Sequence, residues 1–373
     1  MKRHLLVAGA GRMGLDSGLF FLRRGWQVTW LCGDPGRRAE FARRIARENR
    51  RLTEADPAAE GAARVLLIDD AGNFGGDAPE LFLEAVHEDL SQKQRVVSRI
   101  ARLLPAQTPL ATISSSILPA EIHPRCLGAH CFFPLEMTRL VEAIAPRDGG
   151  ERELDTLLEI LQSVGLHAIV QSPSNAFAVN RLLLPLQAEA VRALREGWPA
   201  AVVDGASATP LVPFGQLSLM DAVGLDVIAP AVANYTRRLP STEAQDYAEL
   251  TDTLHALVAA GKCGKKNHDG FLAGSSLPWA TVPRCQADAE ELTHDFEALA
   301  ASTCSRATKS GDIGTVELDL AFSSLFAAAV PLAEERRRCR DAGGFDRLVR
   351  LHRTTGRSYF IPASYFRATA AAP

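Results

Sequence analysis

An imidazole and a carboxylate stand twelve residues apart in the stretch from residue 127 to residue 142, as His130 and Glu142. A histidine that is held and charge-compensated by a carboxylate is the usual acid/base unit near neutral pH. The competing interpretation is a core histidine satisfied by the backbone, with an unrelated glutamate at the surface. We therefore treat the pair as a candidate acid/base site whose elements must be identified.

Pro134 interrupts the stretch between the two residues. The apolar runs on either side, Cys126 to Phe132 and Arg139 to Ala145, predict two strands joined by a loop. If these strands lie side by side, Glu142 can approach His130 laterally.

The first 25 residues predict a strand, a glycine turn and a helix. The strand is His4 to Ala8, and the turn is Gly9-x-Gly11-x-x-Gly14. In this context the glycines provide a tight turn, close approach of a pyrophosphate, and close packing of helix on strand. The alternative is a glycine-rich turn without a ligand. We expect a dinucleotide to contact Gly9, Gly11, Arg12, Met13 and Gly14.

The second predicted strand, Gln27 to Cys32, lacks the acidic residue that usually ends it and binds the adenosine ribose. Cys32 stands in its place, and Asp34 follows two residues later. Asp34 would favour NAD, whereas Arg37 and Arg38 would favour the 2′-phosphate of NADP. We expect NAD, with NADP as the alternative.

Further strands are predicted at Arg64 to Ile68, Glu80 to Ala85 and Pro109 to Ile113, with a helix from Ser91 to Leu104. Strands alternating with helices predict a parallel, doubly wound sheet. Ligands bind such sheets at the carboxyl ends of the strands, where residues 114–116 supply three serines. These serines could equally be turn or helix-cap residues.

A helix from Glu151 to Val164 and a strand from Leu166 to Gln171 complete the alternating part. Beyond residue 172 the pattern becomes helical, beginning with a long helix, Ala176 to Trp198, that contains Pro185. The sequence therefore predicts an α/β domain followed by an all-α domain.

Composition excludes several classes of protein. The 373 residues are 47% hydrophobic and 23% charged, with a net charge of −3, which indicates neither disorder nor a general affinity for nucleic acid. Seven cysteines without C-x-x-C or metal-ligand spacing predict reduced thiols, a cytoplasmic location and no metal site. The sequence contains no run of 18 apolar residues, so it predicts no membrane span.

Taken together, these motifs resemble the L-3-hydroxyacyl-CoA dehydrogenase family over nearly all of the chain up to about residue 275. The matching segments are the glycine motif of residues 9–14, Leu83 to Glu88 with Lys93, Ser114 to Leu118, Gly128 to Phe132 with Leu140 to Glu142, Phe177 to Leu183, Asp221 to Asp226, and Gly261 to Lys266 followed by Gly270 and Phe271. The resemblance implies a Rossmann-type nucleotide-binding domain, a helical C-terminal domain and an NAD-dependent oxidoreductase.

Carried over by this resemblance, His130 is the catalytic base and Glu142 orients it. Ser115 and Asn180 are then the polar groups near the substrate oxygen, and Glu84 and Lys93 belong to the cofactor site. Asn180 comes from the helical domain, so the resemblance implies a substrate cleft between the domains.

Three positions depart from the family pattern, namely Cys32 in place of an acid, and Ile113 and Phe133 in place of asparagines. These changes indicate a specialised member. The leading hypothesis is interconversion of a 3-hydroxyacyl and a 3-oxoacyl thioester, carried on CoA or on an acyl carrier protein. The alternatives are a dehydrogenase of a free 3-hydroxy acid and a non-catalytic nucleotide-binding paralogue.

About a hundred residues follow the region of resemblance. Asp341 to Asp346 echoes Asp221 to Asp226, which suggests a second, degenerate copy of the helical domain. We expect domains at 1–171, 172–275 and 289–373, with residues 272–288 as a linker. A duplicate could bury the face that shorter relatives bury by dimerising, so either a monomer or a homodimer through the helical domains is expected.

Overall fold

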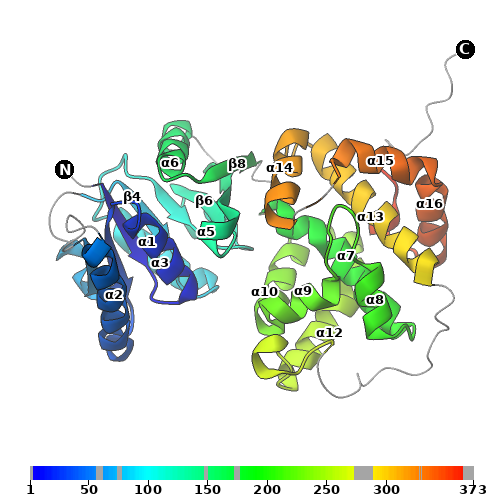
Figure 1. Cartoon of the computed structure of the whole chain (residues 1–373), viewed down its shortest axis with the longest axis horizontal. Coiled ribbons are helices and arrows are strands. Elements are labelled where there is room, and N and C mark those ends of the chain that lie inside the picture. Colours follow the sequence, from blue (N-terminus) through cyan, green and yellow to red (C-terminus); the bar gives the residue numbers. More distant parts are fainter. Residues whose placement is uncertain are drawn as a thin grey trace, which may run out of the picture. The chain divides into compact units, whose positions relative to one another are not determined.

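The computed structural model describes residues 3–55, 62–73, 78–146, 150–171, 177–272, 289–326, 328 and 330–363. The chain forms two compact units, Met1–Phe177 and Ala178–Pro373, called here the sheet unit and the helical unit (Figure 1). The predicted boundary at residue 172 and residues 273–288 of the predicted linker lie outside the described residues.

The sheet unit is built on eight strands in the order β3-β2-β1-β4-β5-β6-β7-β8. The strands are β1 His4–Ala8, β2 Gln27–Cys32, β3 Ala63–Leu67, β4 Leu81–Glu84, β5 Leu110–Thr112, β6 Cys126–Cys131, β7 Leu140–Ile144 and β8 His167–Gln171. β6 and β7 are antiparallel, whereas the other neighbouring pairs are parallel. The predicted fold class, a doubly wound sheet followed by a helical domain, is confirmed.

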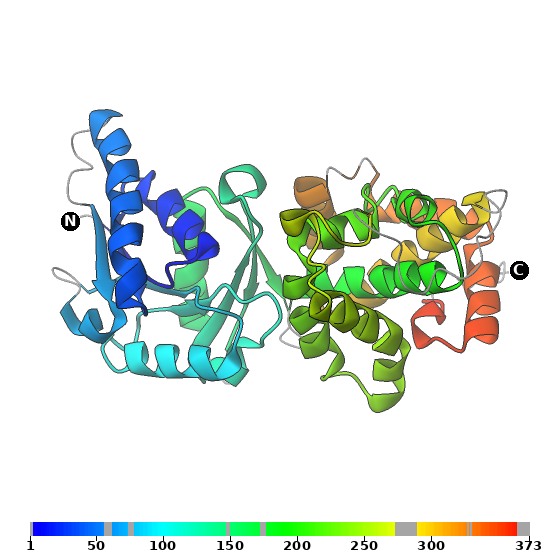
Figure 2. The ribbon, with the colours of Figure 1, turned by 90° about the horizontal axis from the view of Figure 1, so that it is seen from below.

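Helices cover both faces of this sheet, and strands such as β1 are therefore buried along their whole length. One apolar cluster joins the sheet to α1 (Arg12–Leu22), α2 (Pro35–Ala55) and α6 (Glu151–Ser163). The cluster on the other face includes α3 (Leu90–Ala101) and α4 (Pro119–Ile122). Figure 2 shows α3 across the sheet from α1 and α2. A short 3-10 helix, η2, spans Ile68–Asn73, and α5 spans Leu135–Thr138.

The glycine motif brings α1 close to the sheet. A Cβ on Gly18 would lie 2.2 Å from the Trp30 ring, and the Trp30 indole N–H donates to the carbonyl of Gly14 at 2.9 Å. The N-terminus of α1 is thereby placed at the carboxyl ends of β1 and β2, where a dinucleotide would bind.

The predicted strands lie where they were expected, with small differences at their ends. β7 begins at Leu140 rather than at Arg139, because Arg139 ends α5 in a left-handed conformation with φ of 49°. Directly after this residue the backbone joins β7, which pairs with β6.

In its described residues the helical unit contains helices and no strand. The helices are α7 Ala178–Arg195, α8 Ala200–Ala206, α9 Gln216–Val223, α10 Leu225–Thr236, α11 Ser241–Ala244, η3 Gln245–Tyr247, α12 Ala248–Ala259, η4 Lys265–Asn267, α13 Ala289–Lys309, α14 Thr315–Phe326, α15 Leu332–Asp341, α16 Gly344–Thr355 and η6 Ser358–Phe360. Among the described residues no single helix is long and apolar enough to span a membrane, and the pair α9 and α10 reaches that length and composition only across a 107° bend.

The tail packs onto the first part of the helical unit. α13 contacts α7 and α8 as well as α15 and α16, so residues on both sides of the predicted linker share one compact unit (Figure 1). The two echoing sequences both lie at a junction of two helices. Gly224, with φ of 107°, separates α9 from α10, and Gly343, with φ of 79°, separates α15 from α16. This likeness supports the duplication, which stays a prediction.

Candidate active site

The antiparallel pairing of β6 with β7 places His130 directly opposite Glu142. The imidazole Nδ1 lies 2.7 Å from Glu142 Oε2, and both side chains are buried. An ionised carboxylate only accepts hydrogen bonds, so Nδ1 carries the donated proton and Nε2 is the nitrogen left for a ligand. The structure thus brings the two residues of the predicted acid/base pair together.

Gln171 adds a member that the sequence reasoning missed. It ends β8, where it is paired with Ile144 in the parallel ladder, and its side-chain amide donates to Glu142 Oε1. Both oxygens of the fully buried carboxylate therefore have a donor. In the sequence, Gln171 is marked only as a glutamine at the carboxyl end of a predicted strand. In the sheet it lies two residues beyond Ile169, which is paired with Glu142.

Aromatic rings flank the imidazole on two sides. The Phe132 ring centroid is 4.6 Å from that of His130, and the Phe177 ring centroid is 4.9 Å away. Gly128 leaves room for Phe177, since a Cβ at that position would lie 3.0 Å from its ring. The rings restrict how the imidazole can turn, so they support the orientation that Glu142 fixes.

The loop after His130 is held against α1. The backbone N–H of Leu135 donates to Asp16 at 3.2 Å, and Arg24 donates to both oxygens of Glu136 at 3.1 and 3.0 Å. The hydrogen bonds from Arg24 are the main reason that the pKa of Glu136 is lowered. Phe133 packs against the apolar cluster on the α1 side of the sheet. This departure from the family pattern therefore adds core contact where a polar side chain was expected.

A second buried charged cluster lies where β4 passes into α3. Lys93 Nζ is 3.0 Å from both carboxylate oxygens of Glu84 and 3.2 Å from Glu88 Oε2. Thr112 also donates to Glu84, at 2.6 Å. Burial alone would lower the pKa of Lys93, but the two carboxylates raise it. Glu84 and Lys93, predicted as cofactor contacts, are bonded to each other next to the loop that follows β4, and their role toward the cofactor stays a prediction.

The serine run past β5 is divided between two environments. The hydroxyls of Ser114 and Ser116 donate to Glu88 at 2.5 and 2.9 Å, whereas Ser115 is half-buried between them. Burial alone would raise the pKa of Glu88, but the charge of Lys93 and the two serine hydrogen bonds lower it. Ile113, the other family departure in this segment, belongs to the apolar cluster under α1.

A cavity of about 680 Å³ opens over the glycine motif. Its walls include five of the predicted cofactor contacts, namely Gly9, Gly11, Arg12, Met13 and Asp34. Cys32 and Arg37 also line it. Gly14 lies beneath this wall and does not line it. Asp34 and Arg37 form an exposed ion pair at 3.7 Å.

The glycines fit the shape that a dinucleotide requires. A Cβ on Gly9, whose φ is 126°, would lie 2.3 Å from the carbonyl oxygen of Ala85, and a Cβ on Gly14 would lie 2.3 Å from that of Gly9. Gly11 faces open space, with no atom within 4 Å of a Cβ built there. A pyrophosphate can therefore approach the backbone at Gly11, at the N-terminus of α1.

Asn180 lies in the first turn of α7 and is half-buried. It belongs to the helical unit, so its action together with His130 stays a prediction.

Comparison with known proteins identifies two domains of one family, an NAD-binding domain followed by a C-terminal domain. Residues 4–173 match the domain described as 3-hydroxyacyl-CoA dehydrogenase, NAD binding domain, and residues 177–274 match 3-hydroxyacyl-CoA dehydrogenase, C-terminal domain. A curated relative, the fatty acid oxidation complex subunit alpha of Idiomarina loihiensis, is 28% identical over 220 residues, which are 57% of this chain and 30% of that protein. The chain thus spans less than a third of the length of that relative.

Two solved structures share the fold at low identity. The 3-hydroxybutyryl-CoA dehydrogenase of Escherichia coli K12 has a TM-score of 0.76 at 19% identity, covering 98% of each chain. The (S)-3-hydroxybutyryl-CoA dehydrogenase PaaH1 of Ralstonia eutropha has a TM-score of 0.62 at 22% identity, covering 74% of this chain and 100% of that chain. The first of these extends the likeness of fold over the helical tail.

Proposed function

Because the chain belongs to the 3-hydroxyacyl-CoA dehydrogenase family, we propose that it interconverts a 3-hydroxyacyl thioester and its 3-oxoacyl form by acid/base catalysis and hydride transfer. The observation that carries this proposal is the 2.7 Å contact between His130 Nδ1 and the buried Glu142. It leaves Nε2 as the only imidazole atom able to exchange a proton with a substrate hydroxyl.

In the oxidising direction, His130 Nε2 takes the proton of the secondary alcohol. Glu142 stabilises the resulting imidazolium and holds the ring in the tautomer with a proton on Nδ1. Gln171 acts through Glu142 by holding its other oxygen, so we propose it as a positioning residue. In the reducing direction the same imidazolium returns the proton to the oxygen.

The N-terminal part of the chain is an NAD-binding domain. Bound NAD supplies the acceptor for the hydride that leaves the carbinol carbon. We propose that the backbone around Gly9 and Gly11 holds its pyrophosphate and that Asp34 accepts from its ribose. Glu84 and Lys93 would act one layer deeper, by fixing the loop whose residues Ala85, Val86 and His87 line the cavity.

Two polar residues are proposed to bind the substrate oxygen, Ser115 past β5 and Asn180 at the start of α7. A donor placed at an oxygen that gains negative charge in the transition state contributes about 3 kcal/mol. The half-burial of both side chains leaves them able to meet a ligand.

We propose CoA as the carrier of the acyl group, because both matching family domains are described as 3-hydroxyacyl-CoA dehydrogenase domains. The test is the oxidation of NADH with acetoacetyl-CoA, with an acetoacetyl carrier protein and with free acetoacetate. We expect the CoA thioester to give the highest kcat/KM. A higher value with the carrier protein or with the free acid would replace the proposed substrate, and no turnover of any of them would overturn the proposed activity.

His130→Ala is the control for the mechanism. We expect it to lower kcat by about 10²–10⁴-fold, since a general base is removed, while NADH binds with unchanged affinity. Ser17→Ala, which alters a buried hydroxyl away from the imidazole, serves as the comparison variant for folding.

We also propose that the tail makes a partner subunit unnecessary, because α13 covers α7 and α8 within one chain. Light scattering at micromolar concentration should then report a mass close to 40.2 kDa. A mass twice as large would favour a homodimer.

A further inference from the structure

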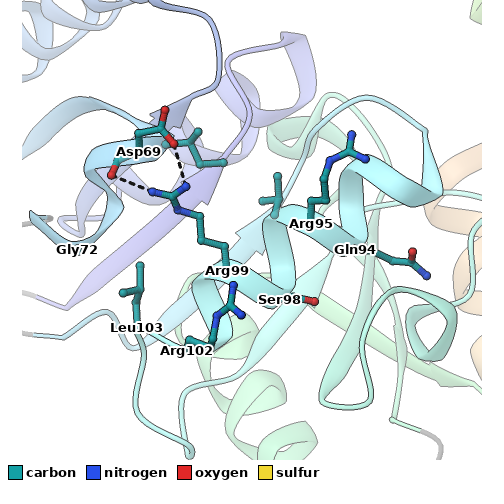
Figure 3. Close-up of a pocket in the computed structure, with 10 residues that line it drawn as sticks. Asp69, Gly72, Gln94, Arg95, Ser98, Arg99, Arg102 and Leu103 are labelled. Carbon is teal, nitrogen blue, oxygen red and sulfur yellow. Dashed lines mark hydrogen bonds and ion pairs between the residues drawn. The ribbon is translucent and has the colours of Figure 1, made fainter.

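A second concave surface lies beside the dinucleotide cavity, on the outer side of α3. Its volume is about 950 Å³, and it is bounded by α3 and by η2 (Figure 3). The lining residues are Ile68, Asp69, Gly72, Gln94, Arg95, Val96, Ser98, Arg99, Arg102 and Leu103. We call this surface the α3 groove.

Three arginines follow one face of α3 at the spacing of successive helix turns, Arg95, Arg99 and Arg102 (Figure 3). Side chains three or four residues apart on a helix are neighbours, and like charges there destabilise the helix. The helix dipole favours Arg99 in the last turn and Arg102 at the C-cap, but it does not account for Arg95 in the middle of the helix.

Within the described residues, Arg99 is the one of the three arginines that forms an ion pair with a carboxylate. Arg99 donates to Asp69 Oδ1 at 2.8 Å and to the Asp69 carbonyl at 3.0 Å, which fixes its guanidinium against η2. Arg95 donates to the hydroxyl of Ser91 at 3.2 Å, and its charge also acts on the exposed carboxylate of Asp89, with which it shares no hydrogen bond. Arg102 has no ion pair within the described part of the chain. Among the described lining residues, the groove thus carries an excess of positive charge at both ends.

The groove and the dinucleotide cavity share a wall. Ile68, Arg95 and Val96 line both of them. Leu103 and the two shared aliphatic residues add apolar surface to the lining of the groove. A ligand in the groove would therefore meet guanidinium groups at its edges, and its charge would lie close to Arg95 and to the bound cofactor.

We propose that the α3 groove is a binding site for a small polyphosphate anion, and that its occupation weakens dinucleotide binding. Guanidinium groups bind phosphate oxygens through paired, charge-assisted hydrogen bonds. The groove lies within the volume range of small-molecule sites. An anion that neutralises Arg95 removes attraction for the negatively charged cofactor, and coupling of this kind is reciprocal.

The test uses tripolyphosphate as the probe and the full-length protein saturated with NADH, so that the glycine motif is already occupied. Calorimetry at roughly 0.1 M ionic strength measures the affinity for the probe. The variant is Arg95→Gln/Arg102→Gln, which keeps the Arg99–Asp69 pair. The matched control is Arg64→Gln/Arg152→Gln, which removes the same charge from two exposed arginines outside both cavities.

We expect one tripolyphosphate site on the unaltered protein, bound at least about ten-fold more weakly by the groove variant and equally by the control. The Kd for NADH should rise at least about two-fold when tripolyphosphate is saturating, and this rise should be absent in the groove variant. Absence of binding, an equal loss in the control variant, or an NADH affinity that ignores the probe would each overturn the proposal. All three readouts are independent of turnover.

Discussion

The sheet unit contains two buried polar clusters, each centred on three side chains, that differ in what they leave unbonded. Glu84, Glu88 and Lys93 come from a single strand-to-helix connection of ten residues, and each charge meets an opposite charge or several hydroxyl donors. His130, Glu142 and Gln171 come from three strands, β6, β7 and β8.

The two clusters differ in whether a polar atom remains without a hydrogen-bond partner inside the cluster. Lys93 directs its ammonium at Glu84, Glu88 and the carbonyl of Val86, so no donor remains for a ligand. In the His130 cluster every oxygen of Glu142 is occupied, yet within the described residues no hydrogen bond reaches His130 Nε2. A saturated cluster stabilises the fold, whereas a cluster with one directed, unbonded nitrogen is equipped for proton transfer. Substitutions in each of the two clusters test this contrast.

The largest effect is expected for Glu142→Gln. The substitution keeps the shape of the side chain but removes the charge that stabilises the imidazolium, so kcat should fall by about 10²–10⁴-fold. The Kd for NADH should not change. A kcat within ten-fold of the unaltered protein would remove Glu142 from the mechanism and erase the contrast between the clusters.

Lys93→Met should act on stability rather than on chemistry. It leaves Glu84 and Glu88 buried without a counter-charge, which costs about 3–5 kcal/mol of unfolding free energy. Denaturant unfolding followed by circular dichroism measures this loss. Arg64→Met at an exposed position is the control, and equal stability of the two variants would show that the Lys93 cluster does not stabilise the fold.

Gln171→Met should give an intermediate result. The apolar side chain has a similar length but donates no hydrogen bond to Glu142, so we expect kcat to fall about ten-fold while KM stays unchanged, in line with one hydrogen bond to a charged group. Gln171→Glu cannot donate either while ionised, and should not restore the rate. A change in KM alone would assign Gln171 to substrate binding.

The smallest effect concerns the pH dependence of stability. Burial raises the pKa of Glu88, but the charge of Lys93 and the hydrogen bonds from Ser114 and Ser116 together hold it below its ordinary value of 4.5. A lowered pKa in the folded state contributes stability above the ordinary value, which is lost as the pH falls through the folded one. Glu88→Gln should therefore be less stable by about 1 kcal/mol at pH 7. The difference should shrink below pH 4.5, and a constant difference across that range would contradict the assignment.

Much of the fold could be predicted from local patterns. The glycine motif between β1 and α1, the alternation up to residue 171 and the helical character beyond it each depend on neighbours in the sequence. The proximity of His130 and Glu142 was also inferred, since Pro134 required a loop and two short strands imply a hairpin. Gln171 was not found, because its partner lies 29 residues away and no local pattern reports which strand pairs with β7.

Two departures from the family pattern contribute to the core. Ile113 and Phe133 stand where the pattern has asparagines, and Ile113 lies in the apolar cluster that includes α1 while Phe133 packs against it. The resemblance assigns Glu84 and Lys93 to the cofactor site, and the structure adds that they are bonded to each other next to the loop that lines the cavity over the glycine motif. The sequence shows the type of each of these side chains, but the direction in which each one points depends on packing.

The sequence by itself determined the strand-to-helix order, the glycines that allow a phosphate to approach and the residue types of the acid/base pair. These features depend on backbone freedom, periodicity and turn residues, which act over a few positions. Tertiary structure decided which charges neutralise one another and which nitrogen stays unbonded. That outcome depends on strand register, because a shift of one residue between β6 and β7 would turn Glu142 to the opposite face of the sheet.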